Sequence, residues 1–515
     1  MAKVYLDALL PREDFDVDET QNAVKKKESF SISDIRDTDF FYQTLRKPDF
    51  QRETNEWTPE KICELIKSFI KGELIPAVIL WRSKAGHIFV IDGSHRVSSL
   101  IAWINNDYGD GSITKQAFDG LIPEEQIEIA NRTRKLIEKE IGSYSDFQLS
   151  LKHPEKVRED IANHAKNLAA IAVQLQWVEG DADVAEASFF KINQQAAKID
   201  PTELKLIKSR KKANALASRA IIKGGKGHQY WSKFSESNKL EIVKLSDEIN
   251  KVFFLPKLKN PVKTLDLPIG GKGYSTTSPL LIFEFVNLVN KKYQNIESDD
   301  LDGSYTLEVL KRSRKIAYLI NANHVSSLGL HPAVYFYSKT GRHKTASFFS
   351  ITDFLIELDE KNKLKDFIKV RAKFEDLLIE YDYAVQQILR HYRGSDKALP
   401  HIKNFYLSLM KELLNVRNEG EFDVKNVLAK DDFKFIKTKD IEDGEITNED
   451  FSDETKSSVF ITEALDKALR CKICGARIHM NSISFDHIQR KQDGGLGTSE
   501  NAQLTHPYCN SAIKN

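Results

Sequence analysis

The chain has 515 residues, a formal net charge of +1, and a composition that is 41% hydrophobic and 29% charged. This length is too great for one hydrophobic core and predicts about three domains. The sequence has no run of about 18 apolar residues, which argues against a membrane span. Its four cysteines are too few for a disulfide framework. The acidic N-terminus lacks the apolar segment of a secretory signal, so we expect a protein of the reducing cytoplasm.

The N-terminal third alternates between helix and strand patterns. Residues 1–30 are polar with little periodicity and predict an arm. The stretch TPEKICELIKSFIKG predicts a helix capped by Thr58 and ended by Gly72, because its apolar residues repeat at three- and four-residue spacing. IPAVILW and HIFVIDG read as strands, and SHRVSSLIAWI reads as a helix. Residues 92–96 therefore form a strand-to-helix corner.

Residues 120–420 are mainly helical by the same periodicity. Eight Lys or Arg and no acid fall between residues 205 and 226, a run that either contacts phosphate or forms a charged helix face. Eight Asp or Glu and no base fall between residues 440 and 454, which predicts a solvated linker. The sequence GGKG occurs twice and predicts turns, because neither copy matches a Walker loop.

Three of the four cysteines lie in the last 45 residues. Cys471 and Cys474 form a C-x-x-C pair, and His506 and Cys509 repeat the same gap after 31 intervening residues. A Cys3His set is an accepted tetrahedral site for structural zinc, and so small a module needs the metal in order to fold. These four residues are therefore candidate zinc ligands. The alternatives are four unrelated residues, or a plain zinc ribbon with no catalytic role.

A second set of candidate residues lies between these two pairs and just after them. SISFDHI alternates like a strand and ends in Asp486 and His487, and a glycine-rich loop, Asn501 and Asn510 follow. A metal-dependent phosphodiesterase needs a carboxylate and an amide oxygen to hold Mg2+, and an imidazole to take a proton from the attacking water. Asp486, Asn510 and His487 supply these groups, which a plain zinc ribbon does not need.

The ordered elements C-x-x-C, DHI, GG, N-x-Q-L and C-N resemble the HNH endonuclease family over about residues 466–515. The resemblance implies a ββα-metal fold around one catalytic divalent ion, Mg2+ or Mn2+, beside structural Zn2+. It implies that Asp486 and Asn510 bind the catalytic ion and that His487 is the general base. It also implies that Asn501 fixes the loop holding this histidine. One departure is His506, where many zinc-bearing members have cysteine.

The corner sequence DGSHR allows two interpretations. The first is an Asp-Gly turn followed by a helix that Ser94 caps. The second is an anion site, because the N-terminus of a helix favours negative charge. In that case Arg96 grips a phosphate, while Asp92 binds a metal ion or activates water.

Three segments, DFQRETNEW, VIDGSHR and FFKINQQ, resemble the DGQQR family over about residues 35–215. This family is a ParB/sulfiredoxin-like domain of GmrSD-type and SspE-type restriction systems. The resemblance implies a pocket that binds and hydrolyses a nucleotide or senses modified DNA. The pocket residues that it implies here are Gln51, Arg52, Trp57, Asp92, Gly93, His95, Arg96, Phe190 and Asn193. The sequence departs from the family motif in having Ser94 and His95 in place of two glutamines, and only histidine titrates near neutrality.

Together these features predict an α+β multidomain protein. Its expected parts are a polar arm (1–30), a ParB/sulfiredoxin-like sensor domain (31–215), a helical domain (216–430), an acidic linker (431–460) and a zinc-bearing HNH domain (461–515). The predicted function is modification-dependent, type IV-like DNA restriction in antiphage defence. The N-terminal domain would sense a nucleotide or a DNA modification and would license cleavage. The family resemblance adds nucleoside triphosphate hydrolysis as an activity of this domain, and the departure DGSHR supports anion binding but not this hydrolysis.

The expected partners are DNA, including modified phage DNA, and a nucleoside triphosphate. A second copy of the chain is expected where both strands are cut, because one HNH site cuts one strand. No membrane partner is expected. The alternative functions are an unregulated toxin-like HNH nuclease and a non-enzymatic zinc-ribbon regulator that binds DNA.

Overall fold

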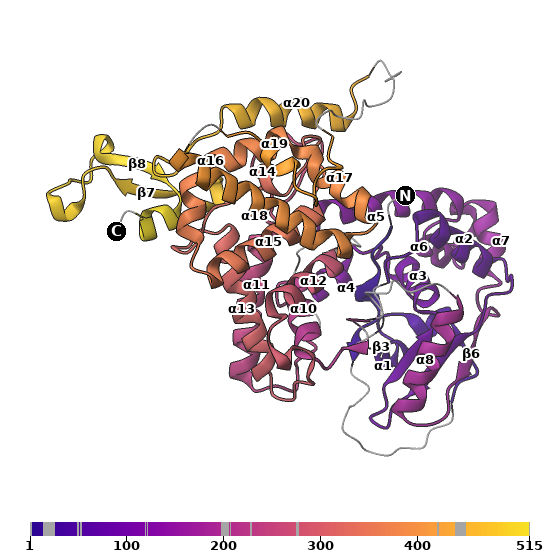
Figure 1. The fold of residues 1–515 in the computed structure, drawn as a ribbon. Helices are drawn as coiled ribbons and strands as arrows, with labels where there is room; N and C mark the ends of the chain where they lie inside the picture. The colour runs from indigo at the N-terminus through magenta and orange to yellow at the C-terminus, as the bar shows by residue number, and fades with distance from the viewer. Residues whose placement is uncertain are drawn as a thin grey trace. The chain divides into compact units, whose positions relative to one another are not determined.

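The computed structural model of the protein describes residues 3–13, 26–48, 51, 54–118, 120, 122–196, 205–206, 208–226, 229–273, 278–419, 422–437 and 450–513. The chain divides into two compact units (Figure 1). The first unit comprises Met1–Arg210 and Lys226–Tyr230, and the second comprises Lys211–Gly225 and Trp231–Asn515.

The first unit is built on a mixed six-stranded sheet with the order β1-β3-β5-β4-β6-β2. The pairs β1–β3, β3–β5 and β4–β6 are parallel, and β4–β5 and β2–β6 are antiparallel. The strands are β1 (Arg12–Glu13), β2 (Ser29–Ser31), β3 (Leu45–Pro48), β4 (Val78–Arg82), β5 (Ile88–Asp92) and β6 (Ala172–Trp177). The α-helices of this unit are α1 (Phe40–Thr44), α2 (Pro59–Ile70), α3 (Ser94–Asn105), α4 (Ser112–Ala117), α5 (Glu124–Glu140), α6 (Tyr144–Ser150), α7 (Glu159–Ala165) and α8 (Ala182–Ala196).

The two central strands are covered on both faces. Leu80 and Val90 belong to the larger core, whereas Trp81 and Phe89 pack with Phe189 of α8 in a second core. Successive residues of a strand point to opposite faces, so a strand buried on both faces reads as a continuous apolar run. The predicted strands in IPAVILW and HIFVIDG are confirmed, and this double burial explains their composition.

The two predicted helices of the N-terminal third are also confirmed, but only one has the predicted cap. Thr58 caps α2 by accepting a 3.5 Å hydrogen bond from the backbone N of Lys61. The prediction that Ser94 caps α3 is wrong. Gly93 occupies the N-cap position with φ +99°, and buried Ser94 is the first helical residue, so no side chain caps this helix. Only glycine adopts such a φ without strain, and this conformation turns the chain sharply between β5 and α3.

Part of the predicted arm is built into the first unit. Val4, Leu6 and Leu9 are buried in the larger core, and β1 pairs with β3. The backbone N of Leu6 also donates to the carbonyl of Thr54 at 2.8 Å. The apolar residues at 4–10 therefore have a packing role that their polar flanks conceal, whereas residues 14–25 lie outside the described residues.

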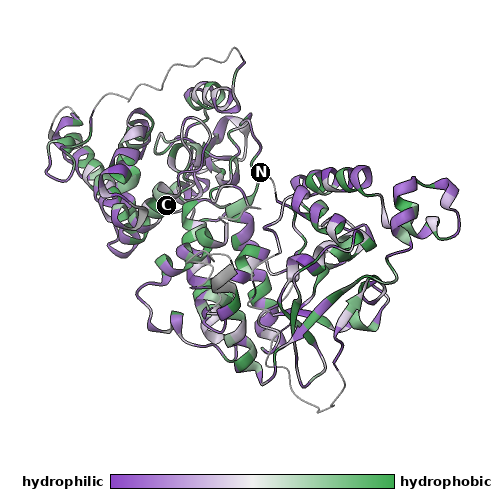
Figure 2. Ribbon diagram, turned by 90° about the vertical axis from the view of Figure 1, so that its right-hand side faces the viewer, coloured by the Kyte–Doolittle hydropathy of each residue, from purple (hydrophilic) through white to green (hydrophobic). Residues whose placement is uncertain are grey.

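The second unit is mainly helical, as the sequence predicts. Along α11 the buried residues Ile242, Leu245, Ile249 and Phe253 recur at helical spacing, which puts one face of the helix into the core. Figure 2 shows both hydrophobic and hydrophilic residues on individual helices, as amphipathic packing requires. The helices are α10 (Ala213–Lys223), α11 (Glu236–Phe254), α12 (Ser278–Asn290), α13 (Ser304–Ile320), α14 (Pro332–Tyr335), α15 (Thr345–Glu360), α16 (Leu364–Glu380), α17 (Asp382–Tyr392), α18 (Ser395–Glu419), α19 (Lys425–Leu428) and α20 (Asp453–Asp466).

The C-terminal residues add a hairpin and a short helical turn to this unit. The antiparallel strands β7 (Ser484–His487) and β8 (Ala502–Thr505) pair Asp486 with Gln503 and His487 with Ala502. The π-helical turn η8 (Cys509–Ile513) packs against β7. Two strands and one short helical element match the ββα arrangement expected of this segment.

The basic run at residues 205–226 and the acidic run at residues 440–454 have different roles in the structure. In the basic run, Arg210 donates to both carboxylate oxygens of Glu186 at 2.7 Å, and Lys212 lies 4.0 Å from Glu297. At the end of the acidic run, Asp453 and Glu454 open α20, where the helix dipole favours negative charge. Helix α20 thus covers residues assigned in part to the linker, while residues 438–449 lie outside the described residues.

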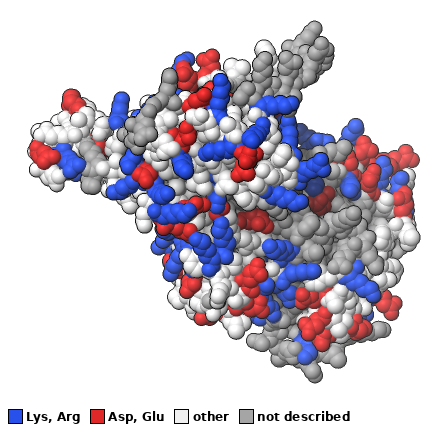
Figure 3. All heavy atoms as spheres, viewed as in Figure 1, with Lys and Arg blue, Asp and Glu red and all other residues white. Residues whose placement is uncertain are grey.

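Basic and acidic side chains are interspersed on the face shown in Figure 3. In the described part of the chain, no helix is long and apolar enough to cross a membrane.

Candidate functional site

The four candidate zinc ligands come together in space. One ligand atom from each of Cys471, Cys474, His506 and Cys509 lies within 4.8 Å of the others. The Nδ1 atom of His506 is 3.4 Å from Sγ of Cys474 and 3.9 Å from Sγ of Cys509. Three sulfurs and one imidazole nitrogen at this spacing fit a metal such as zinc. The two sequence pairs therefore build one cluster.

The second ring nitrogen of His506 fixes its orientation. Its Nε2 is 3.0 Å from the carbonyl oxygen of Arg477, which can only accept a hydrogen bond. Nε2 must therefore carry the proton, and Nδ1 presents its lone pair to the three sulfurs. Burial lowers the pKa of His506 below its ordinary value, which keeps the imidazole neutral. This is the form that binds a metal.

Two glycines allow the cluster to sit closely on the helical body. Gly329 has φ +61°, and a Cβ there would lie 2.8 Å from Cδ2 of His506. A Cβ at Gly475 would lie 3.3 Å from the Cβ of Ala372 in α16. Any side chain at Gly329 would push the helical body and the metal ligand apart, so this glycine is required by close approach.

The end of β7 carries the candidate catalytic pair. Asp486 is buried, and its Oδ2 accepts a 2.7 Å hydrogen bond from Nε2 of its cross-strand partner Gln503. His487 is the last residue of the strand and is half-buried. Gln503 was not singled out from the sequence, although its place in N-x-Q-L and the antiparallel register are the signals that would have identified it.

Asn501 closes the loop that follows His487. Its Oδ1 accepts from the backbone N of Gln489 at 2.7 Å, and its Nδ2 donates to the carbonyl of Leu496 at 2.7 Å. The carbonyl of Asn501 accepts from the backbone N of Ile488 at 2.8 Å. One side chain thus ties Gln489, just after His487, to Leu496 within the glycine-rich loop. The positioning role of Asn501 stays a prediction.

Asn510 is anchored to the same hairpin from η8. Its Nδ2 donates to Oγ of Ser484 at 2.8 Å and to the carbonyl of Phe485 at 3.2 Å. The amide nitrogen is therefore held by β7, and the amide oxygen has no hydrogen bond among the described residues. An amide oxygen is a suitable ligand for a hard divalent cation such as Mg2+.

The corner after β5 brings together residues of the second candidate site. Nη2 of Arg96 donates to Oδ2 of Asp92 at 2.7 Å and to the carbonyl of Ala77 at 3.2 Å. A Cβ at Gly93 would lie 2.9 Å from this Nη2, so glycine makes room for the guanidinium. Nε of Arg96 is buried and has no hydrogen-bond partner within the described ranges. The arginine is folded back over the turn and held by the aspartate.

An aromatic pair lies next to this corner. The rings of His95 and Trp57 are stacked, with centroids 5.5 Å apart and an interplanar angle of 25°. Nε2 of His95 accepts a 3.3 Å hydrogen bond from the backbone N of Glu56. The segment containing Trp57 and the start of α3 are therefore tied together through this histidine.

The remaining predicted residues of that site are placed less completely. Gln51 is buried, and its Oε1 has no hydrogen-bond partner in the part of the chain that the structure describes. Phe190 packs against the second apolar core, with its ring centroid 5.6 Å from that of Phe189. Arg52 and the side chain of Asn193 lie outside the described residues.

A buried ion network lies beside Gln51, and no sequence pattern predicts it. Asp7 pairs with Arg12 at 2.9 Å and with the fully buried ammonium of Lys47, and it also accepts from the backbone N of Thr54 at 3.0 Å. Arg12 in turn donates to the carbonyl of Gln51. These residues come from separate segments of the chain, so no local pattern reveals the network.

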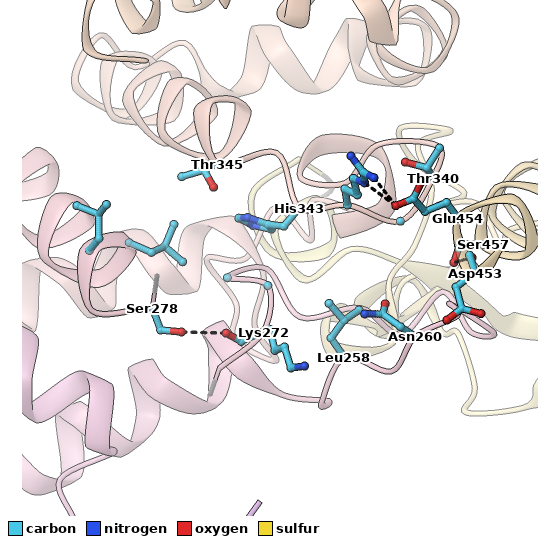
Figure 4. Close-up of a pocket in the computed structure, with 16 residues that line it drawn as sticks. Leu258, Asn260, Lys272, Ser278, Thr340, His343, Thr345, Asp453, Glu454 and Ser457 are labelled. Carbon is cyan, nitrogen blue, oxygen red and sulfur yellow. Dashed lines mark hydrogen bonds and ion pairs between the residues drawn. The ribbon is translucent and has the colours of Figure 1, made fainter. Parts of the chain in front are cut away.

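The second unit also has a surface hollow of about 550 Å³ at one of the two GGKG turns (Figure 4). Lys272 and Arg342 line it together with Asp453 and Glu454, and Arg342 donates to Glu454. Because cations and carboxylates contribute equally, its charge does not favour a phosphate. This agrees with the interpretation of the GGKG sequence as a turn.

Comparison with protein families gave two matches. Residues 32–210 match the N-terminal domain of the GmrSD restriction endonuclease, and residues 471–515 match the HNH endonuclease. Comparisons with curated proteins and with solved structures gave no significant match. The two family matches support a restriction-type nuclease, and nuclease domains of this kind imply DNA as the substrate. The chain thus joins an N-terminal region similar to that of GmrSD restriction endonucleases to a C-terminal region similar to HNH endonucleases.

Proposed function

We propose that the protein is a DNA restriction endonuclease that cuts at the β7–β8 hairpin and is licensed by its N-terminal domain. One observation carries the nuclease half of this proposal. Asp486 and His487 end a strand whose surroundings are fixed by Asn501 and Asn510, while the Cys3His cluster is a separate site. A zinc ribbon alone would not need this second set of groups.

In this proposal Asp486 and the amide oxygen of Asn510 hold Mg2+ or Mn2+, which supplies Lewis-acid stabilisation of the scissile phosphate. Gln503 orients Asp486 through its hydrogen bond. His487 accepts a proton from the attacking water, and Asn501 keeps the loop after His487 in place. Structural zinc in the Cys3His cluster holds the two ends of the module together.

We further propose that the corner at Asp92–Arg96 is the sensor site. Nε of Arg96 and Oε1 of Gln51 are buried without partners among the described residues, which is uncommon unless a ligand or water satisfies them. Arg96 can pair with a phosphate in place of Asp92, and the released carboxylate can then bind a metal ion or activate water. The ligand would be a nucleoside triphosphate or a modified site in phage DNA.

The proposed setting is antiphage defence in the cytoplasm. One HNH site cuts one strand, so double-strand breaks by this protein would require a second copy of the chain. The unregulated toxin-like nuclease shares the hairpin chemistry but lacks the sensor, and the two proposals separate when the corner residues are changed.

The experiment that tests the nuclease assignment is plasmid nicking by the purified full-length protein with Mg2+ or Mn2+. His487→Ala should remove nicking while the bound zinc remains. Equal nicking by the wild type and this variant would exclude the hairpin as the catalytic site.

A further inference from the structure

A fully buried arginine is connected to the metal-ligand cluster by a few short contacts. The side chain of Arg371 in α16 has no exposed surface, and Nη2 donates to the carbonyl of Gly329 at 2.9 Å. Nη1 donates to the carbonyl of Leu328, and Nε donates to Oε1 of Glu375 at 3.0 Å. A buried cation held so completely is a fixed charge in a medium of low dielectric constant.

Two short routes connect this arginine to the ligand His506. Gly329 accepts from Arg371 through its carbonyl, and a Cβ added at Gly329 would lie only 2.8 Å from Cδ2 of His506. Along the other route, Oε2 of Glu375 accepts from the backbone N of Arg477 at 2.8 Å. The carbonyl of Arg477 then accepts from Nε2 of His506 at 3.0 Å. Both routes pass through buried residues.

The charges of these groups complement the loaded cluster. Three thiolates and one Zn2+ leave one negative charge on a Cys3His site. Arg371, Glu375 and Arg477 have buried side chains and together leave one positive charge. Asp376 pairs with Arg477 at 2.9 Å, and Arg470 lies 3.7 Å from Asp376, so these two more exposed groups cancel and leave the sum unchanged. A buried charge is expensive unless it is paired, so each group lowers the cost of burying the other.

We infer that Arg371 is the counter-ion of the zinc–thiolate cluster and that α16 is part of the zinc site. Arg371 is a positioning residue, because it acts through Gly329 and Glu375 rather than by contacting the metal. The inference rests on the zinc assignment and is independent of nuclease activity. It also makes the HNH segment a part of the helical body rather than a separable module.

The test uses the full-length protein and the variants Arg371→Met, Arg371→Lys and Lys369→Met. Lys369 is an exposed cation on the same helix and serves as the matched control. Zinc affinity is measured by competition with a chromophoric chelator, and the site is observed through the thiolate charge-transfer bands of bound Co2+. Changes of groups outside the ligand sphere typically weaken metal binding roughly 10- to 100-fold, and we expect Arg371→Met to fall in this range.

Arg371→Lys should recover part of the affinity because it keeps the charge, and Lys369→Met should bind zinc as the wild type does. Wild-type affinity and Co2+ bands in Arg371→Met would overturn the inference. If Arg371→Met does not fold, amide hydrogen exchange of the wild-type protein before and after zinc removal decides. The inference predicts lost protection at residues 327–330 and 371–377, and unchanged protection there would overturn it.

Discussion

The backbone N–H of Arg477 donates a 2.8 Å hydrogen bond to the buried carboxylate of Glu375, a residue 102 positions away in the sequence. This contact joins the chain just after the first cysteine pair to the middle of α16. The side chain of Arg477 extends the connection, since Nε donates to the carbonyl of Leu465 and Nη1 to Asp376. The C-terminal segment is therefore held by the helical body at several points.

Glu375→Ala should lower the free energy of unfolding of the full-length protein by about 3–5 kcal/mol, because it leaves Arg371 buried without its carboxylate. Denaturant unfolding measures this change. Asp376→Ala is the control, because Asp376 is exposed at 45% and an exposed pair contributes about 1 kcal/mol or less. Similar losses in the two variants would contradict the role assigned to the buried pair.

Stability should fall as the pH drops from about 6.5 toward 4. Burial lowers the pKa of His479 to about 4, and burial beside other positive groups also lowers the pKa of His331. Both histidines are neutral in the folded protein but gain protons on unfolding, so acid favours the unfolded state across this window. The shift of His479 alone corresponds to roughly 3 kcal/mol.

The measurement for this pH effect is the free energy of unfolding at several pH values for the wild type and His479→Gln. The free energy of unfolding of the variant should fall less steeply than that of the wild type as the pH drops from about 6.5 toward 4. The same slope in both proteins would mean that His479 is not responsible.

His487→Ala should reduce the rate of DNA nicking roughly 10²- to 10⁴-fold, the usual contribution of a general base. Gln503→Ala should cause a smaller loss, because it removes only the hydrogen bond that orients Asp486. Initial rates at saturating DNA measure both effects, and zinc content serves as the control for folding. A larger loss in Gln503→Ala than in His487→Ala would reverse the assigned roles.

Gly93→Ala should destabilise the protein more than the addition of one methyl group would suggest. The glycine has φ +99°, and an added Cβ would meet Nη2 of Arg96 at 2.9 Å. Backbone strain of this kind costs about 1–3 kcal/mol, which thermal unfolding can measure. Gly72→Ala provides a control with φ +71° and no neighbouring atom within 4 Å, so the difference between the two variants isolates the clash. Equal destabilisation of Gly93→Ala and Gly72→Ala would show that the side chain of Arg96 moves aside without a measurable cost in free energy.

Much of the local structure was predictable because it depends on neighbours in the sequence. Thr58 and the apolar spacing after it set α2, and the repeated two-residue gaps brought Cys474 and His506 into one cluster. The alternation around Phe485 likewise predicted β7. The physical causes are a helix cap, a metal site and a half-covered face of a sheet. Each of them requires particular residue types at short spacing in the sequence.

The remaining features depend on contacts between distant segments. Arg371 and Glu375 lie one helical turn apart in a charged helix and carry no signal of burial in the sequence, yet both side chains are fully buried. Asp7 and Lys47 form a buried pair for which the sequence offers no periodic signal. Ser94 is a typical capping residue, but the positive φ of Gly93 moved the helix start by one residue.

The most direct test of the account is cleavage of matched DNA substrates by the full-length protein with Mg2+ or Mn2+. The substrates are unmodified DNA and DNA carrying glucosylated cytosine or phosphorothioate, each with and without a nucleoside triphosphate. His487→Ala and Asp92→Ala are assayed in parallel. The account predicts that the wild type cuts only one class of DNA, or only with the nucleotide. His487→Ala should cut every substrate roughly 10²- to 10⁴-fold more slowly. Asp92→Ala should lose the restriction to licensed DNA or lose cutting altogether. Indiscriminate cutting by the wild type, or undiminished cutting by His487→Ala, would contradict it.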